Sequence, residues 1–151
     1  MKPVANLSHL WPELPYLDRF DAASAAGFTG VEVLFPYDVA AKETQRALTR
    51  DGLQMVLINA PPPNYTGGAR GFSAAPGGEA RFAHDMRRAF RYANALGVPM
   101  IHVMSGYASG QAAKDAMITN LRQAVQDAPA GLTLLLEPLC PESQPDYFLN
   151  D

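Results

Sequence analysis

A single acidic residue follows the most apolar stretch of this sequence. Glu137 comes directly after Leu132-Thr-Leu-Leu-Leu136 and directly before Pro138. A continuous apolar run of this length, bounded by glycine and proline, predicts a β-strand that is buried on both faces. A carboxylate at the end of such a strand is costly to bury unless a metal ion or a cationic partner compensates its charge. We therefore interpret Glu137 as a residue at the mouth of a functional site.

Polar side chains also stand at or near the ends of four other apolar segments. These residues are Asn6, Glu32, Asn59 and His102. The carboxyl ends of parallel strands meet at one edge of a sheet or barrel, where ligands bind, so we expect these side chains to converge there. Alternatives stay open for each: the two asparagines could satisfy loop backbone groups, Glu32 could be a hydrogen-bonded acid within its strand, and His102 could be a core histidine.

Two further candidates lie in loops. Arg70 belongs to the Pro/Gly-rich segment 60–78, a length that is typical of functional or disordered loops. Glycines at 67, 68 and 71 would let its guanidinium fold over the edge of the sheet and bind a substrate carboxylate with two hydrogen bonds. The alternative is a solvated loop arginine. His9 lies in the first loop, where it would overhang the same site.

The elements that must position these residues alternate between strands and helices. We expect strands at 3–7, 30–35, 53–59, 98–104 and from Gly131 onward, and helices at 15–27, 38–52, 79–96 and 111–127. Strands that alternate with helices predict βαβ units with right-handed crossovers, and therefore an α/β fold with a parallel sheet. On the helix 79–96, the charges Arg81, Asp85, Arg88 and Arg91 are interpreted as a solvated face without a function.

The composition limits the classes of function. The chain has 151 residues, enough for one domain with a sizeable core, and 48% of them are hydrophobic. A net charge of −3 gives no basic surface, so we expect no nucleic-acid partner. We also expect no membrane span and no secretion signal. The single cysteine, Cys140, excludes an intrachain disulfide framework and is compatible with a cytoplasmic protein.

Seven blocks of residues resemble hydroxypyruvate isomerase and, equally, the 2-oxo-tetronate isomerases. The blocks are Ala5-Asn-Leu-Ser8, the segment Gly27–Asp38 with Gly-Val-Glu and Phe-Pro-Tyr-Asp, Gly68-Ala-Arg-Gly71, Pro76-Gly77, His102-Val103, Leu136-Glu-Pro138 and Tyr147-Phe-Leu149. The resemblance spans the whole chain and implies a TIM barrel of the xylose-isomerase-like superfamily. Residues 1–151 would be a single domain, the N-terminal portion of a (β/α)₈ barrel with about five βα units.

The resemblance also implies an activity and a set of site residues. It implies isomerisation of hydroxypyruvate to tartronate semialdehyde through an enediol(ate), with a divalent metal, Mg²⁺ or Mn²⁺, and two proton-transferring glutamates. Glu137 matches the first glutamate, as metal ligand and acid/base. Arg70 would hold the substrate carboxylate, and the residues expected to line the pocket are His102, Asn59, Asn6 and His9. The remaining metal ligands come from strands six to eight of the family, for which this sequence has no counterpart.

The length of the sequence adds two expectations. If the chain ends at Asp151, we expect a weak or inactive isomerase, and the alternative function is a non-catalytic truncated barrel that binds small carboxylates through Arg70. The first and fifth strands would then have unpaired edges, which predicts a homo-oligomer formed by edge pairing.

Overall fold

The computed structural model describes residues 2–62 and 70–150, and its five strands form one parallel sheet. The strands are β1 (Val4–Asn6), β2 (Gly30–Val33), β3 (Gln54–Asn59), β4 (Met100–His102) and β5 (Thr133–Leu135). Each is somewhat shorter than the sequence predicts, but all five lie within the expected segments. The glycines at 67 and 68, which were expected to free Arg70, lie outside the described residues.

Four α-helices and one short 3₁₀ helix connect the strands. They are α1 (Asp18–Ala25), η1 (Pro36–Asp38), α2 (Ala41–Asp51), α3 (Glu79–Leu96) and α4 (Gly110–Asp127). Gly52 and Gly97 end α2 and α3 with φ values of 66° and 67°, in the left-handed region that glycine adopts without strain. The expected start of α2 at Asp38 is wrong, because η1 and the extended Val39 come first. No helix within residues 2–62 and 70–150 is long and apolar enough to cross a membrane.

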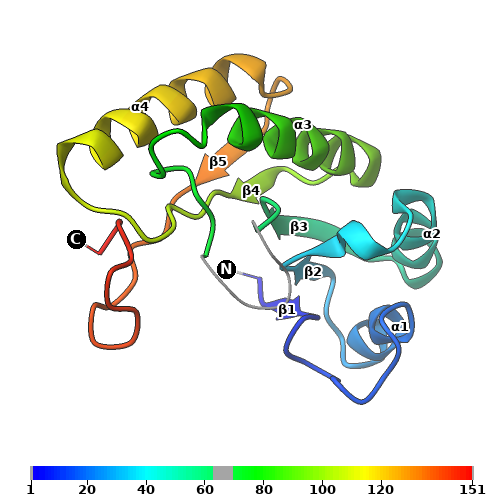
Figure 1. The fold of residues 1–151 in the computed structure, drawn as a ribbon. Coiled ribbons are helices and arrows are strands. Elements are labelled where there is room, and N and C mark those ends of the chain that lie inside the picture. Colours follow the sequence, from blue (N-terminus) through cyan, green and yellow to red (C-terminus); the bar gives the residue numbers. More distant parts are fainter. Residues whose placement is uncertain (1, 63–69, 151) are drawn as a thin grey trace.

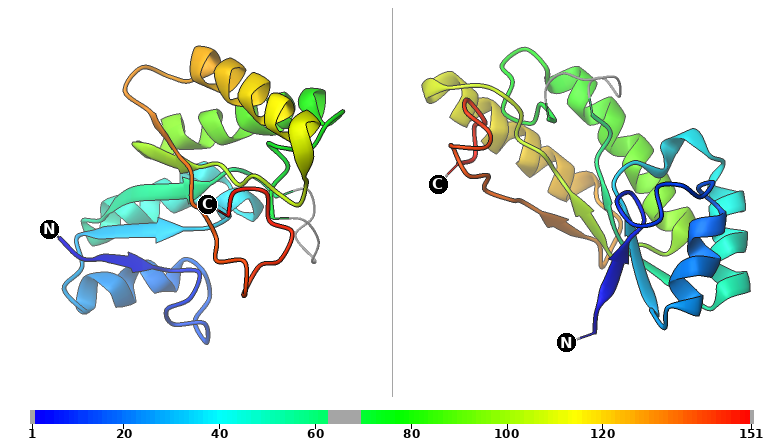
Figure 2. Two further views of the ribbon diagram at one scale, coloured as in Figure 1. Left: turned by 90° about the vertical axis from the view of Figure 1, so that its left-hand side faces the viewer. Right: turned by 90° about the horizontal axis from the view of Figure 1, so that it is seen from below.

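The strands follow one another across the sheet in sequence order, β1-β2-β3-β4-β5, and every neighbouring pair is parallel. This order is that of a (β/α) barrel, whereas a doubly wound sheet reverses direction at a switch point. The helices cover the convex side of the curved sheet, and no helix covers its concave side (Figures 1 and 2). The predicted α/β fold with a partial barrel is therefore confirmed.

Alternation along the strands separates the core from the concave face. Val31, Met55 and Ile101 are fully buried in the hydrophobic core that the helices cover. Glu32 pairs in register with Leu57, and both line the concave side. A register shift between Val31 and Glu32 leaves an additional residue in β3 at this point.

The fifth strand is less buried than its apolar sequence predicts. Within β5, Thr133 is exposed, and Leu136, just beyond the strand, is 44% exposed. The expectation of a strand buried on both faces is wrong. β5 pairs only with β4 among the described strands, so its other edge and part of its concave face have no covering element.

The charged side of α3 is also not simply solvated. Asp85 is only 7% exposed and forms an ion pair with Arg81 at 2.7 Å. The Arg88 guanidinium stacks over the ring of Tyr37 and donates a hydrogen bond to the Tyr37 carbonyl at 2.9 Å. These contacts tie α3 to η1, so part of the charge run fixes the packing of two neighbouring elements.

Candidate functional site

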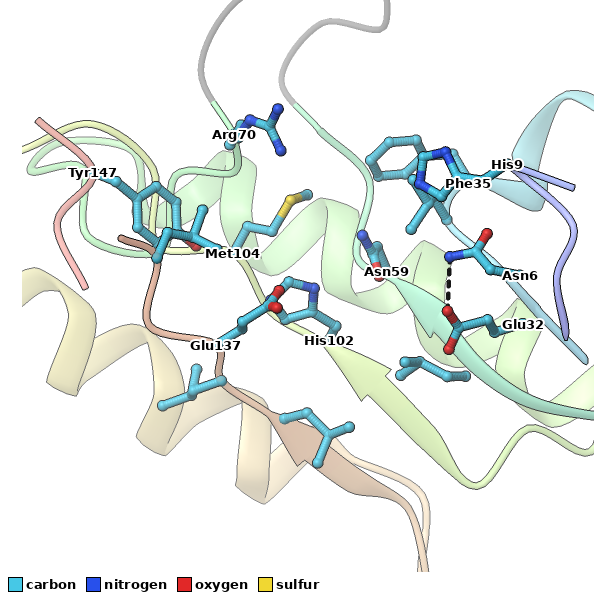
Figure 3. A pocket seen from close by; sticks show the side chains of 15 residues that line it. Asn6, His9, Glu32, Phe35, Asn59, Arg70, His102, Met104, Glu137 and Tyr147 are labelled. Atoms are coloured by element: carbon cyan, nitrogen blue, oxygen red, sulfur yellow. Dashed lines mark hydrogen bonds and ion pairs between the residues drawn. The ribbon is translucent and has the colours of Figure 1, made fainter. Parts of the chain in front are cut away.

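A cavity of about 620 Å³ lies at the carboxyl ends of the strands, on the concave side of the sheet. Figure 3 shows the side chains that line it. All the residues predicted from the sequence as candidate site residues are among them, namely Asn6, His9, Asn59, Arg70, His102 and Glu137. Glu32 lines the same cavity. The parallel topology thus brings these residues together from six separate parts of the chain.

One wall of the cavity is formed by Asn6 on β1 and Glu32 on β2. These residues pair in register, and Asn6 Nδ2 donates a hydrogen bond to Glu32 Oε1 at 2.7 Å. Asn6 Oδ1 accepts a hydrogen bond from the Ser8 backbone N–H at 3.0 Å. Asn6 therefore satisfies a loop N–H, as one of the two alternatives from the sequence predicts, and it also binds a carboxylate that lines the cavity.

The loop after β1 is held against β2 by a second hydrogen bond. Ser8 Oγ accepts a hydrogen bond from the Leu34 backbone N–H at 2.9 Å. This contact keeps the first loop at the rim, where His9 is exposed and lines the cavity. His9 therefore lies over the cavity, as the sequence predicts.

The floor of the cavity is formed by Asn59 and His102, which pair in register between β3 and β4. Asn59 is buried, and its backbone carbonyl accepts a hydrogen bond from the Tyr37 hydroxyl. His102 Nε2 is buried and has no hydrogen-bond partner within the described part of the chain. Burial lowers the pKa of His102 below its ordinary value of 6.5, while the charges of Glu137 and Glu32 act in the opposite direction. Burial therefore favours the neutral form of the His102 imidazole.

Glu137 lies two residues beyond β5, at the opposite wall from Glu32 (Figure 3). Its side chain is 63% exposed, and Oε2 lies 3.8 Å from His102 Nε2. This distance is too long for a hydrogen bond. The carboxylate and the imidazole thus face each other without a hydrogen bond between them, the carboxylate exposed and the imidazole nitrogen buried.

Arg70 is placed at the rim by a close backbone contact between two loops. Gly71 forms an isolated antiparallel bridge with Ser105, just after β4. Gly71 has a φ of 76°, and a Cβ there would overlap the backbone carbonyl of Met104. Only glycine allows this approach. Arg70 is exposed and forms no hydrogen bond or ion pair within residues 2–62 and 70–150, so its guanidinium is available to an anion in the cavity.

Several lining residues were not selected as site residues from the sequence. These include the apolar and aromatic side chains Phe35, Met104 and Tyr147. Tyr147 is 1% exposed, and its hydroxyl accepts a hydrogen bond from the Ser105 backbone N–H at 3.0 Å. The only sequence signal for Tyr147 was its place in the Tyr-Phe-Leu block, because nothing local predicts that the segment after β5 returns to the β4 loop.

The described residues do not form a complete metal site. No group of three or more His, Cys, Asp or Glu side chains in residues 2–62 and 70–150 could hold a metal ion. Glu137 and His102 offer one carboxylate and one imidazole, whereas Mg²⁺ and Mn²⁺ favour six ligands that are mostly oxygens.

Comparison with known proteins identifies a family match over most of the chain. Residues 20–149 match the family described as "Xylose isomerase-like TIM barrel". A 2-oxo-tetronate isomerase of Haemophilus influenzae is 43% identical over 99% of this chain and 60% of its own length. The hydroxypyruvate isomerase of Escherichia coli is 35% identical over 97% of this chain and 58% of its own length.

A solved structure supports the same fold. The crystal structure of a protein described as AP endonuclease, family 2, from Brucella melitensis superimposes with a TM-score of 0.93 at 41% identity. It is matched over 99% of this chain and 60% of that protein. The chain thus spans about 60% of the length of these relatives.

Proposed function

We propose that this chain, which belongs to the xylose isomerase-like TIM barrel family, provides the substrate cavity of a sugar-acid isomerase. Its substrate would be a small 2-oxo acid with a hydroxyl on the neighbouring carbon, such as hydroxypyruvate, and its product the corresponding 3-oxo acid, such as tartronate semialdehyde. The similarity to proteins named 2-oxo-tetronate isomerase and hydroxypyruvate isomerase supports this class of reaction.

The observation that carries the proposal is the pair formed by Glu137 and His102. Oε2 of the Glu137 carboxylate lies 3.8 Å from Nε2 of the His102 imidazole in one cavity, and the two groups form no hydrogen bond with each other. The Arg70 guanidinium, which has no ion pair among the described residues, lines the same cavity. Proton transfer next to a carbonyl needs a base at the carbon, a donor at the oxygen and a fixed substrate, and these three residues offer those groups.

In the proposed reaction, the Glu137 carboxylate removes a proton from C3 of hydroxypyruvate, and the electrons move onto the C2 oxygen to give an enediolate. Glu137 then returns the proton to C2 on the same face. The hydroxyl proton passes from the C3 oxygen to the C2 oxygen, which leaves an aldehyde at C3. His102, in the tautomer that carries hydrogen on Nε2, donates a hydrogen bond to the oxygen on which negative charge develops.

Arg70 would bind the substrate carboxylate through two parallel hydrogen bonds, which a planar guanidinium can form and an ammonium group cannot. Asn59 would contact a substrate oxygen from the floor of the cavity, beside His102. His9 and Asn6 complete the rim on the β1 side.

We also propose that Glu137 is the ligand that this chain contributes to a divalent metal ion, Mg²⁺ or Mn²⁺. Such an ion, when bound, would stabilise negative charge on two neighbouring substrate oxygens. Titration of the chain with Mn²⁺, followed by water-proton relaxation, tests this assignment. We expect binding that is lost in Glu137→Gln, and unchanged binding in that variant would remove Glu137 from the metal site.

The isomerase proposal is tested by following the hydroxypyruvate methylene signal by NMR in D₂O. We expect tartronate semialdehyde to form and deuterium to enter the substrate, both with wild-type protein and with Glu43→Gln as a control. Glu43 is an exposed acid on α2, away from the cavity. Glu137→Gln should remove both signals. Turnover that persists in Glu137→Gln would show that another group is the base.

A second candidate function is a non-catalytic module that binds small carboxylates through Arg70. The exposure of Glu137 and the incomplete metal-ligand set among the described residues favour this candidate. It predicts that affinity for a small 2-oxo acid is lost in Arg70→Ala but kept in Glu137→Gln, with no deuterium exchange in either. The isomerase instead predicts deuterium exchange in the wild type, weaker exchange in Arg70→Ala and no exchange in Glu137→Gln.

We further propose that the chain self-associates through its open strand edges. β1 and β5 each pair on one side only among the described strands, and Val4 and Leu136 beside these edges are 40% and 44% exposed. Size-exclusion chromatography with light scattering tests this, with Val4→Lys and Leu136→Lys expected to shift the chain to monomer. A monomeric wild-type protein would contradict it.

A further inference from the structure

The two ends of the cavity carry opposite charge. Arg70 lies at one end and Glu32 at the other, with His102 and Asn59 between them (Figure 3). Glu32 has no part in the proton transfer proposed above, yet it is the second carboxylate that lines the cavity. We therefore ask which group of a bound substrate Glu32 would contact.

Glu32 is held in one orientation by its neighbours. Oε1 accepts the hydrogen bond from Asn6 Nδ2 at 2.7 Å, and Asn6 is itself fixed through Oδ1 by the Ser8 N–H at 3.0 Å. Oε2 forms no hydrogen bond within the described part of the chain, although Glu32 is half-buried. A carboxylate oxygen accepts hydrogen bonds and cannot donate them, so Oε2 is suited to a hydroxyl group.

The order of groups along the cavity fixes how a sugar acid can lie in it. With its carboxylate at Arg70 and its reacting carbons beside Glu137 and His102, the remaining end of the molecule extends past Asn59 toward Glu32. The reverse orientation would place the substrate carboxylate against Glu32, which like-charge repulsion opposes in a partly buried site. Glu32 therefore meets the end of the substrate that carries no charge.

We propose that Glu32, positioned by Asn6, is a specificity-determining residue that accepts a hydrogen bond from the hydroxyl on the carbon farthest from the substrate carboxylate. The cavity then prefers four-carbon hydroxy acids and 2-oxo acids, which have such a hydroxyl beyond the reacting carbons, to three-carbon acids, which do not. The preference rests on the proposed function for its substrate orientation. It concerns binding, however, and can be measured without turnover.

The substitution Glu32→Gln is a sharp test because of Asn6. The glutamine carbonyl would keep the hydrogen bond from Asn6 Nδ2, which turns the glutamine NH₂ group, a donor, to the position that Oε2 holds in the wild type. The size of the side chain is retained, while the charged acceptor is lost. Asn6→Ala leaves the carboxylate but removes the group that orients it, and provides a second, independent variant.

The experiment compares the affinities of threonate and glycerate, four-carbon and three-carbon hydroxy acids that are close to the substrates but not reactive, by calorimetric titration of the whole chain. We expect the wild type and Glu43→Gln to bind threonate at least about tenfold more tightly than glycerate, as one charge-assisted hydrogen bond can provide. Glu32→Gln should weaken threonate binding to the level of glycerate and leave glycerate unchanged. Asn6→Ala should reduce the preference by a smaller factor.

Three results would overturn the proposal: equal affinity of the wild type for the two acids, a preference that survives both substitutions, or an equal loss for both acids in Glu32→Gln. The last would mean that Glu32 supports the cavity as a whole. Parallel turnover measurements separate this proposal from the isomerase. A threonate preference without turnover would contradict only the isomerase, whereas turnover without a preference would contradict only the role of Glu32.

Discussion

The two carboxylates of the cavity differ in how the fold holds them. Glu32 belongs to β2, which has a paired strand on each side, and its carboxylate accepts a 2.7 Å hydrogen bond from the neighbouring strand. Glu137 follows β5, which pairs on one side only among the described strands, and its side chain is 63% exposed with His102 at 3.8 Å. Glu32 is thus held in place by a hydrogen bond from a neighbouring strand, whereas the Glu137 side chain is exposed and has no such bond to His102.

This difference indicates a division of roles. A carboxylate that a protein hydrogen bond holds in one orientation is suited to binding a fixed group on a ligand with its other oxygen. A carboxylate without such a bond can move a proton and accept changing partners during a reaction. The cavity therefore combines a rigid β1–β2 wall with a more open β4–β5 wall, and substitutions on the two walls should have different consequences for stability and for activity.

The largest effect is expected from Glu137→Asp. Shortening the side chain by one methylene withdraws the carboxylate from the reacting carbon, which should lower the rate of the proposed isomerisation by about a hundredfold. Because the side chain is mostly exposed, the free energy of unfolding should change by no more than about 0.5 kcal/mol. NMR turnover and urea unfolding measure the two quantities. Loss of stability together with activity would contradict the view that this wall is open.

Substitution of Arg70 should affect binding next most strongly. Arg70→Ala should raise the KM for hydroxypyruvate about tenfold or more, since it removes a charge-assisted pair of hydrogen bonds. Arg70→Lys should recover only part of this loss, because an ammonium cannot form the planar two-bond contact. Steady-state kinetics with both variants measures the effect. Full recovery by lysine would show that only the positive charge matters.

On the rigid wall, Asn6→Ala should cost stability. It removes the hydrogen bond to Glu32 and leaves the Ser8 N–H without its acceptor, so the free energy of unfolding should fall by about 1–2 kcal/mol. Urea unfolding of this variant beside Glu137→Gln tests the comparison directly. Equal stabilities of the two variants would mean that the two walls do not differ as the geometry indicates.

The smallest expected effect is on the titration of His102. In metal-free protein its pKa should lie below 6.5, because burial disfavours the imidazolium. The neutral form is thus favoured by folding, and this contribution to stability is present above pH 6.5 and is lost as the pH falls through the lowered pKa. Glu137→Gln should lower the pKa further, and Glu32→Gln by less, as followed by NMR of the ring protons. A rise in either variant would contradict the assigned contacts.

Much of the fold can be predicted from local sequence patterns. Helix α3 has the predicted bounds Glu79–Leu96, because glycine on one side and the left-handed Gly97 on the other limit an amphipathic run. All five strands were expected, and four of them follow a glycine that ends a helix or turn, namely Gly27, Gly52, Gly97 and Gly131. The buried contacts of Asp85 and Arg88 were missed, because their partners are distant in sequence and helix periodicity does not report them.

Part of the site could also be predicted from the sequence. In parallel βα units, the carboxyl ends of all strands lie at one rim, so the sequence predicts that Asn59 and His102 lie close together. Tyr147 and the environment of Glu137 could not be expected, because one depends on a loop that returns to β4 and the other on which strands flank β5.

By itself, the sequence determined the alternation of strands and helices, the parallel sheet and the set of polar residues that face one cavity, because these depend on periodicity and on chain direction. Only the tertiary structure decided how each of those residues is held. The hydrogen bond between neighbouring strands makes Glu32 a fixed acceptor. Burial favours the neutral form of the His102 imidazole. The position of Glu137 after β5 leaves its carboxylate exposed.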